Sequence, residues 1–134
     1  MSTHNMKNKK HIIIGSTLVL IIAVLLMIVP ASSATKLAEK DFIEKYTSTQ
    51  GAVLLDVRTP EEFSIGHIQS AINIDFQNQS FLSDIKNLDN TKTYFVYCRS
   101  GNRSGKAVSL MKEHGFTNIY ELQGGIISSP ELLK

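Results

Sequence analysis

The stretch that decides the fold is "YFVYCRSGNRSGKAVSLMKEHG", which runs from Tyr94 to Gly115. Its first four residues are aromatic or β-branched and predict a buried strand. From Ser104 to His114 the apolar residues recur at helical spacing, and Gly115 follows where a helix commonly ends in a left-handed residue. Cys98, the single cysteine of the chain, therefore lies in a short loop between the end of a strand and the start of a helix.

Strands and helices alternate on both sides of this loop. "AVLLDV" predicts a buried strand, and "TPEEF" predicts a helix with Thr59 as N-cap, Pro60 at its first position and Glu62 completing a capping box. We also expect a helix over 36–48 capped by Thr35, a strand over 71–74, a helix over 80–88 capped by Ser80, and a strand over 118–122. Because the strands are apolar runs, the pattern predicts an α/β fold with a doubly wound parallel sheet and helices on both faces.

Residues 1–34 differ in composition from the remainder. Three lysines precede Ile12–Val29, an uncharged and mostly apolar stretch of 18 residues. This stretch exceeds the roughly 7–15 residues of a signal-peptide core and is close to the minimum of about 17 for a membrane-spanning helix. "PASSAT" follows, and Ala34 would suit a cleavage site. We expect a hydrophobic helix that is either a membrane anchor or a cleaved signal peptide, with residues 35–134 as an exported domain.

The charge of the predicted domain excludes one class of partner. Of the fourteen basic residues, Lys7, Lys9 and Lys10 precede the apolar stretch, which leaves eleven basic residues against twelve acidic ones over 35–134, a net charge of −1. Electrostatic binding to nucleic acid needs a basic surplus, so we do not expect it. A chain of 134 residues has room for one such domain.

The position of Cys98 favours a reactive thiol. Exported domains often pair their cysteines, but Cys98 has no partner in the chain, which leaves an intermolecular link, a reactive group or a buried apolar residue. The loop "RSGNR" can turn successive N–H groups inward ahead of a helix N-terminus, which favours an anion. With Arg99 and Arg103 nearby, such a loop would lower the pKa of the thiol. No histidine lies close in sequence, so a Cys/His pair is not indicated.

Three segments together resemble a known family. "LLDVRTPEEFSIGHIQSAINI", "YFVYCRSGNRSGKA" and "GFTNIYELQGG" resemble the signature segments of a single-domain rhodanese, a sulfurtransferase, over Lys36–Gly125. Small exported rhodaneses such as the phage-shock-protein sulfurtransferase are similar in type. The resemblance implies a rhodanese-like fold in which a Cys98 thiolate takes sulfur from an anionic donor such as thiosulfate, holds it as a persulfide and passes it to cyanide or a thiol. We expect neither a cofactor nor a metal.

The resemblance also assigns roles around the cysteine. The residues expected to bind the donor are Arg99, Ser100, Gly101, Asn102, Arg103 and Ser104. Asp56 and Arg58 match an Asp-x-Arg motif at a strand end, which we interpret as scaffolding with Arg58 paired to Glu61 or Glu62. We interpret His67 as a loop histidine with local hydrogen bonds rather than a catalyst.

One part of the family pattern is absent. Gly124 and Gly125 resemble the double glycine that shapes a loop near the rhodanese site. The family commonly has a tryptophan a few residues further on, whereas this chain has none and continues as "IISSPELLK". The wall of the acceptor pocket is therefore the part that the resemblance does not define.

Two other functions are compatible with a cysteine in such a loop. A cysteine phosphatase needs an arginine six residues after the cysteine, where its guanidinium can bind the phosphate. Here that position holds Ser104, and Arg103 comes one residue too early, so the loop is one residue short for a tetrahedral phosphate. The second alternative is a non-catalytic module that binds a partner or senses oxidation through Cys98.

Overall fold

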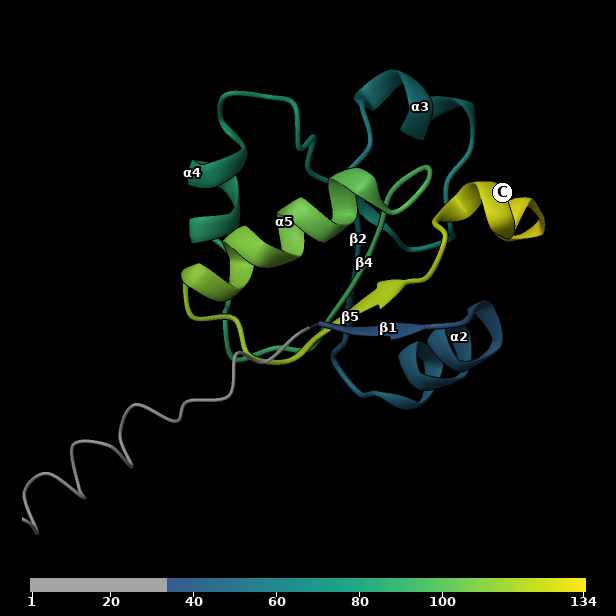
Figure 1. Ribbon diagram of the computed structural model, residues 1–134, viewed down its shortest axis with the longest axis horizontal. Helices are drawn as coiled ribbons and strands as arrows, with labels where there is room; N and C mark the ends of the chain where they lie inside the picture. The colour runs from purple at the N-terminus through teal and green to yellow at the C-terminus, as the bar shows by residue number, and fades with distance from the viewer. Residues whose placement is uncertain (1–33) are drawn as a thin grey trace, which may run out of the picture. The chain divides into compact units, whose positions relative to one another are not determined.

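The protein was analysed as a computed structural model that describes residues 34–134 (Figure 1). Its centre is a five-stranded sheet of order β1-β5-β4-β2-β3, in which every neighbouring pair is parallel. The strands are β1 (Thr35–Leu37), β2 (Val53–Asp56), β3 (Ile72–Asn73), β4 (Tyr94–Tyr97) and β5 (Ile119–Leu122). The helices are α2 (Glu39–Ser48), α3 (Pro60–Ile65), α4 (Phe81–Lys86), α5 (Asn102–Glu113), and the 3-10 turns η1 (Ile126–Ser128) and η2 (Pro130–Leu132). The predicted α/β class is confirmed.

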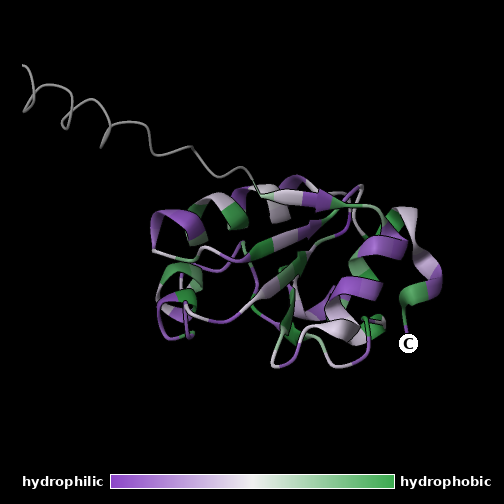
Figure 2. Cartoon of the chain, turned by 90° about the horizontal axis from the view of Figure 1, so that it is seen from below, coloured by the Kyte–Doolittle hydropathy of each residue, from purple (hydrophilic) through white to green (hydrophobic). Residues whose placement is uncertain are grey.

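Helices cover both faces of the sheet, which explains why the inner strands are apolar runs. On one face, α4 and α5 pack on side chains of β2, β4 and β5 such as Leu55 and Val96. On the other face, α2 places Phe42 against Phe95, with ring centroids 5.4 Å apart. The helices alternate hydrophobic and hydrophilic residues along their length, as expected for elements with one buried side (Figure 2).

The strand order creates a switch point beside Cys98. The chain passes from β2 to its neighbour β3 on one side, and from β4 to its neighbour β5 on the other. β2 and β4 pair directly, with Asp56 opposite Tyr97. The connections therefore diverge at the carboxyl ends of these two strands, where α/β sheets bind their ligands. Arg58 and Cys98 follow these two ends.

The first element differs from the prediction. Thr35 does not cap a helix, because residues Thr35–Leu37 form β1 and pair with Tyr120–Leu122 of β5. The helix begins after Ala38, whose side chain makes no capping hydrogen bond. A short strand at the sheet edge is stabilised by this distant pairing, and the local pattern of residues carries no trace of it.

The starts of the next two helices differ from the prediction in detail. Ser80 occupies the N-cap position of α4, but its hydroxyl donates to Asp84 Oδ2 at 2.7 Å instead of capping a backbone N–H. Helix α5 begins at Asn102 rather than Ser104, because Gly101 takes the left-handed conformation (φ +91°) and turns the chain directly into the helix. In contrast, the capping box of α3 between Thr59 and Glu62 is confirmed.

The predicted N-terminal segment lies outside the described residues. The apolar stretch 12–29 and the cleavage site near Ala34 precede or border residues 34–134, so the boundary between 1–34 and 35–134 stays a prediction. Within residues 34–134, no helix is long and apolar enough to cross a membrane.

Candidate active site

Cys98 lies directly after β4 with no exposed surface. The backbone N–H of Gly101 donates to its Sγ at 3.1 Å, and the thiol lies 3.4 Å from the hydroxyl oxygen of Ser104 in the first turn of α5. The left-handed conformation of Gly101 then turns the chain from this hydrogen bond directly into α5. The predicted arrangement of strand, tight loop and helix around the cysteine is present.

Hydrogen bonds determine the acidity of Cys98. Burial is the largest single effect and opposes the thiolate, but the Ser104 hydroxyl and the backbone N–H groups of Ser104, Ser100 and Gly101 outweigh it. The pKa of Cys98 therefore lies below its ordinary value. The loop N–H groups that the sequence predicted to favour an anion are thus among the causes of the lowered pKa, and the Ser104 hydroxyl is a further one.

Ser104 connects the cysteine to a carboxylate that sequence reasoning missed. The Ser104 hydroxyl donates to Glu121 Oε1 at 2.7 Å, and Glu121 is 1% exposed in the middle of β5. Its other oxygen, Oε2, lies 3.9 Å from Lys36 Nζ of β1. The signal available in the sequence was an acidic residue inside the apolar strand "IYEL".

The two arginines of the loop have different surroundings. Arg103 forms a bidentate ion pair with Glu62 of α3, at 2.6 and 2.8 Å. The hydrogen bond from Arg103 is the largest cause that lowers the pKa of Glu62 to about 2. Arg99 is exposed at the surface. The capping box that forms α3 thus also fixes the carboxylate that holds Arg103.

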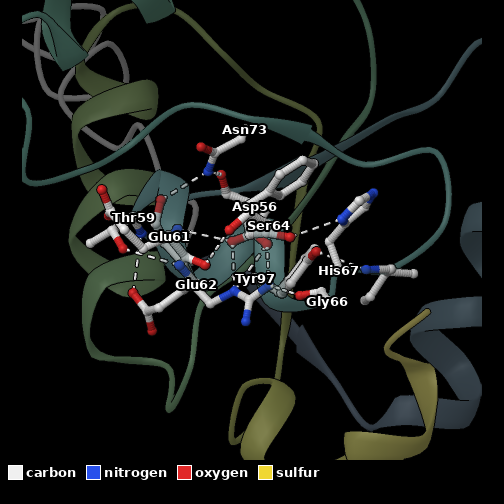
Figure 3. Close-up of polar contacts among 12 residues, drawn as sticks. Asp56, Thr59, Glu61, Glu62, Ser64, Gly66, His67, Asn73 and Tyr97 are labelled. Carbon is white, nitrogen blue, oxygen red and sulfur yellow. Dashed lines mark hydrogen bonds and ion pairs between the residues drawn. The ribbon is translucent and has the colours of Figure 1, made fainter.

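Asp56 and Arg58 form a buried scaffold at the end of β2, and Figure 3 shows Asp56 near Asn73 and Gly66. Arg58 donates from Nε and Nη2 to the Asp56 carboxylate at 2.7–3.0 Å, and its Nη2 also reaches the carbonyl of Gly66 at 2.7 Å. The Asn73 amide donates to the carbonyls of both residues. Arg58 therefore pairs with Asp56 and not with Glu61 or Glu62, because its buried guanidinium lies beside the nearer carboxylate.

His67 has local partners, as predicted. Its Nδ1 lies 3.0 Å from the carbonyl oxygen of Phe63, and the two rings stack with centroids 3.8 Å apart. Its backbone exchanges hydrogen bonds with Lys134 (Figure 3 shows the ring beside α3). These contacts hold the turn after α3.

The conformation and close packing of Gly124 and Gly125 explain why two glycines occur in succession after β5. Both have positive φ angles, +75° and +66°. A Cβ on Gly125 would lie 2.5 Å from the carbonyl oxygen of Arg99 and 2.6 Å from the nitrogen of Ser100. The next two N–H groups, of residues 126 and 127, donate to the carbonyls of Cys98 and Arg99 at 2.9 Å. The segment after β5 therefore supports the cysteine loop from its carbonyl side.

A pocket of about 330 Å³ opens beside the loop. Its lining residues are Arg58, Glu62, Ile65, Arg99, Ile126, Ile127, Pro130 and Leu133. The side chains of Ile65 and Ile127 are 88% and 56% exposed, an unusual state for large apolar residues. The residues of η1 and η2 thus form a wall where the family pattern has its tryptophan.

Comparison with known proteins identifies the fold family. A sequence model of the rhodanese-like domain matches residues 38–128. The chain belongs to the rhodanese-like domain family. A rhodanese-related protein from Thermoplasma volcanium has a similar structure, with a TM-score of 0.63 and 34% identity over 72% of this chain and 91% of that one. A rhodanese-like domain protein from Staphylococcus aureus, at 22% identity, shares the fold with a TM-score of 0.61 over 69% of this chain and 88% of its own.

Relatives of this rhodanese domain include both small and larger proteins. A tRNA uridine(34) hydroxylase of Buchnera aphidicola is 37% identical over 73% of this chain, which spans only 32% of that protein. A thiosulfate sulfurtransferase, GlpE, of Pseudomonas entomophila is 37% identical over 57% of this chain and 68% of its own length. The uncharacterized protein YqhL of Bacillus subtilis is 41% identical over 66% of this chain and 67% of its own length.

The described part of the rhodanese domain offers no obvious metal site. Among residues 34–134, no group of three or more His, Cys, Asp or Glu side chains lies close enough together to hold an ion.

Gly125 should be intolerant of any side chain. We expect Gly125→Ala to lower the free energy of unfolding by about 2–4 kcal/mol, because the added Cβ collides with the backbone of the cysteine loop. Gly51→Ala is the matched control, since Gly51 also has a positive φ (+71°) but no atom within 4 Å of an added Cβ. It should cost only about 1 kcal/mol. Equal losses in urea denaturation would contradict the assigned contact.

The pair of Glu62 and Arg103 should stabilise the domain in a defined pH range. The folded pKa of Glu62, about 2, lies below its ordinary 4.5, so its stabilisation is complete above about pH 4.5 and is lost as the pH falls through about 2. We expect Glu62→Gln to lower the free energy of unfolding by about 1–2 kcal/mol near neutral pH, with the difference from the wild type vanishing near pH 2.

The exposed neighbour Glu61 provides the control for this experiment. Glu61→Gln removes the same charge from the same helix, where the exposed side chain makes no hydrogen bond to any residue of 34–134. Denaturant titrations at several pH values should show little change for this variant. A pH-independent difference between Glu62→Gln and the wild type would contradict the role assigned to the ion pair.

Proposed function

We propose that this rhodanese domain is a sulfurtransferase that carries a sulfane sulfur on Cys98. The observation that supports it best is the cradle of Cys98, a buried thiol with a lowered pKa that receives the Gly101 N–H at the end of a core strand. Such a loop stabilises an anionic sulfur without an adjacent histidine.

The first half-reaction loads the cysteine. The Cys98 thiolate attacks the outer sulfur of a donor such as thiosulfate, so that a new S–S bond forms, the bond to the sulfite sulfur breaks, and sulfite leaves with the electron pair. The persulfide anion then lies against the loop N–H groups. Cys98 has no exposed surface, whereas Arg99 and Ser100 of the same loop are exposed, so the donor approaches Sγ from the side of these two residues. Arg99 supplies positive charge for the approaching dianion.

The second half-reaction transfers the sulfur from Cys98 to an acceptor. A thiolate or cyanide attacks the outer sulfur of the persulfide, forms a bond to it and releases the Cys98 thiolate. The apolar pocket with Ile65 and Ile127 at its mouth lies beside the loop and can hold the body of an acceptor. Storage of the sulfur on the protein divides one transfer into two easier steps.

The relatives support this reaction class. GlpE of Pseudomonas entomophila is named a thiosulfate sulfurtransferase, and this chain covers 68% of it. The tRNA uridine(34) hydroxylase of Buchnera aphidicola contains a similar domain, and the matched region spans 32% of that protein. Thiosulfate is therefore the donor to test first.

Two alternatives receive less support. A phosphatase needs a free arginine at the end of the loop, whereas Arg103 is bound to Glu62 through both of its terminal nitrogens and Ser104 occupies the sixth position. A redox sensor that closes a disulfide needs a second cysteine, and the chain has one.

The decisive experiment treats the purified full chain with thiosulfate. We expect release of sulfite, a mass gain of one sulfur atom at Cys98, and thiocyanate on addition of cyanide. Cys98→Ser should abolish all three because the acceptor sulfur is gone. Hydrolysis of an aryl phosphate without any sulfur gain would instead establish a phosphatase. Absence of both activities would favour the non-catalytic binding module.

We further propose that the domain works outside the cytoplasm. The apolar stretch 12–29 with its preceding lysines supports an anchor or a signal peptide. Fractionation of cells that express the full chain, followed by N-terminal sequencing, tests this directly. An anchored protein would keep residues 2–34 and stay in the membrane fraction, and a cleaved one would begin near Thr35 in the exported fraction. Recovery of the intact chain from the cytosol would contradict export.

A further inference from the structure

Glu121 is a buried carboxylate to which sulfur transfer has so far given no role. It is 1% exposed in β5, and an unpaired charge at such a place is costly. Within residues 34–134, each of its oxygens has one partner. Oε1 accepts the Ser104 hydroxyl at 2.7 Å, and Oε2 lies 3.9 Å from Lys36, whose side chain is 60% exposed.

Ser104 lies between Glu121 and Cys98, and its single hydroxyl proton can be donated to only one of them at a time. Its Oγ lies 2.7 Å from Glu121 Oε1 and 3.4 Å from Cys98 Sγ. While the hydroxyl donates to Glu121, only its lone pairs face the sulfur, so Ser104 accepts a hydrogen bond from the thiol. The hydroxyl lowers the pKa of Cys98 only when its proton turns to the thiolate. A thiolate would then face those lone pairs and add a second negative charge to a buried cluster. Like charges this close cannot both form cheaply.

We propose that Glu121 is the proton acceptor of Cys98, with the Ser104 hydroxyl passing the proton between them. The S–H bond breaks as the thiol proton binds Ser104 Oγ, and the original hydroxyl proton moves to Glu121 Oε1. The products are a thiolate, a neutral carboxylic acid, and a serine hydroxyl that now donates to the sulfur. The cluster carries one negative charge before the transfer and one after it, so no second buried charge is created.

The charged groups around the cluster favour different positions of the proton. Lys36 of β1 stabilises the charge on Glu121. Arg103 of α5 attracts the charge on Cys98 but is shared with Glu62. Lys45 of α2 lies over the Tyr120 ring and belongs to the other face of the sheet.

A shared proton has a measurable consequence. While the pair holds a single proton, the fraction of thiolate depends only on how Cys98 and Glu121 share that proton, so it does not change with pH until the proton is lost to solvent. An isolated thiol behaves differently, since its thiolate fraction rises about tenfold per pH unit below its pKa. The inference uses the proposed sulfur transfer only to give the thiolate a purpose, and the proton transfer can be measured without a sulfur donor.

The test is the rate of alkylation of Cys98 by iodoacetamide in the full chain as a function of pH. For the wild type we expect a plateau, with a rate that changes less than about twofold across the neutral range after correction for the reagent. Glu121→Gln keeps the size of the side chain and its ability to accept the Ser104 hydroxyl. We expect it to show a single titration with a tenfold rise per pH unit on its acid side.

Two further variants make the result specific. Glu113→Gln removes a carboxylate that is exposed at the end of α5, and it should keep the wild-type plateau. Ser104→Ala removes only the linking hydroxyl, and it should lose the plateau as Glu121→Gln does. This arm keeps the inference testable if thermal unfolding shows that Glu121→Gln does not fold.

The outcomes separate this inference from the proposed function. A plateau that persists in Glu121→Gln or in Ser104→Ala overturns the proton transfer, even if thiosulfate still loads Cys98. A single titration in the wild type overturns it as well. Loss of the plateau in both variants supports it, even if thiosulfate proves not to be a donor.

Discussion

The close approach of Gly125 to the backbone of Arg99 and Ser100 is the constraint on which the site depends. No side chain fits between these segments, and the N–H groups that follow Gly125 bind the carbonyls of Cys98 and Arg99. With its carbonyls held on that side, the loop can turn its N–H groups toward the sulfur. The cradle is therefore built by packing of backbone on backbone.

The side-chain charges around the cradle are largely neutralised in pairs. Asp56 binds Arg58 at the end of β2, and Glu62 binds Arg103 at the start of α5. An anionic sulfur is then stabilised by peptide N–H groups and the Ser104 hydroxyl rather than by a free guanidinium.

Local signals predicted most of the elements near the site. The capping box at Thr59 and the apolar spacing of α5 depend on residues within one or two turns, so they could be recognised in the sequence. The edge strand β1 could not, because pairing with β5 stabilises it. Ser80 was misjudged for a similar reason, since Asp84 competes for its hydroxyl within the folded helix.

The sequence alone determined that a lone thiol follows a core strand, precedes a helix and belongs to a rhodanese-like pattern, because all of these are properties of neighbouring residues. Only the tertiary structure decided which groups surround that thiol. Arg58 took Asp56 as its partner, Arg103 took Glu62, and Ser104 took Glu121. Two of these pairs join elements that are far apart in the chain and meet only when parallel strands align their carboxyl ends, and no local spacing rule encodes such a meeting.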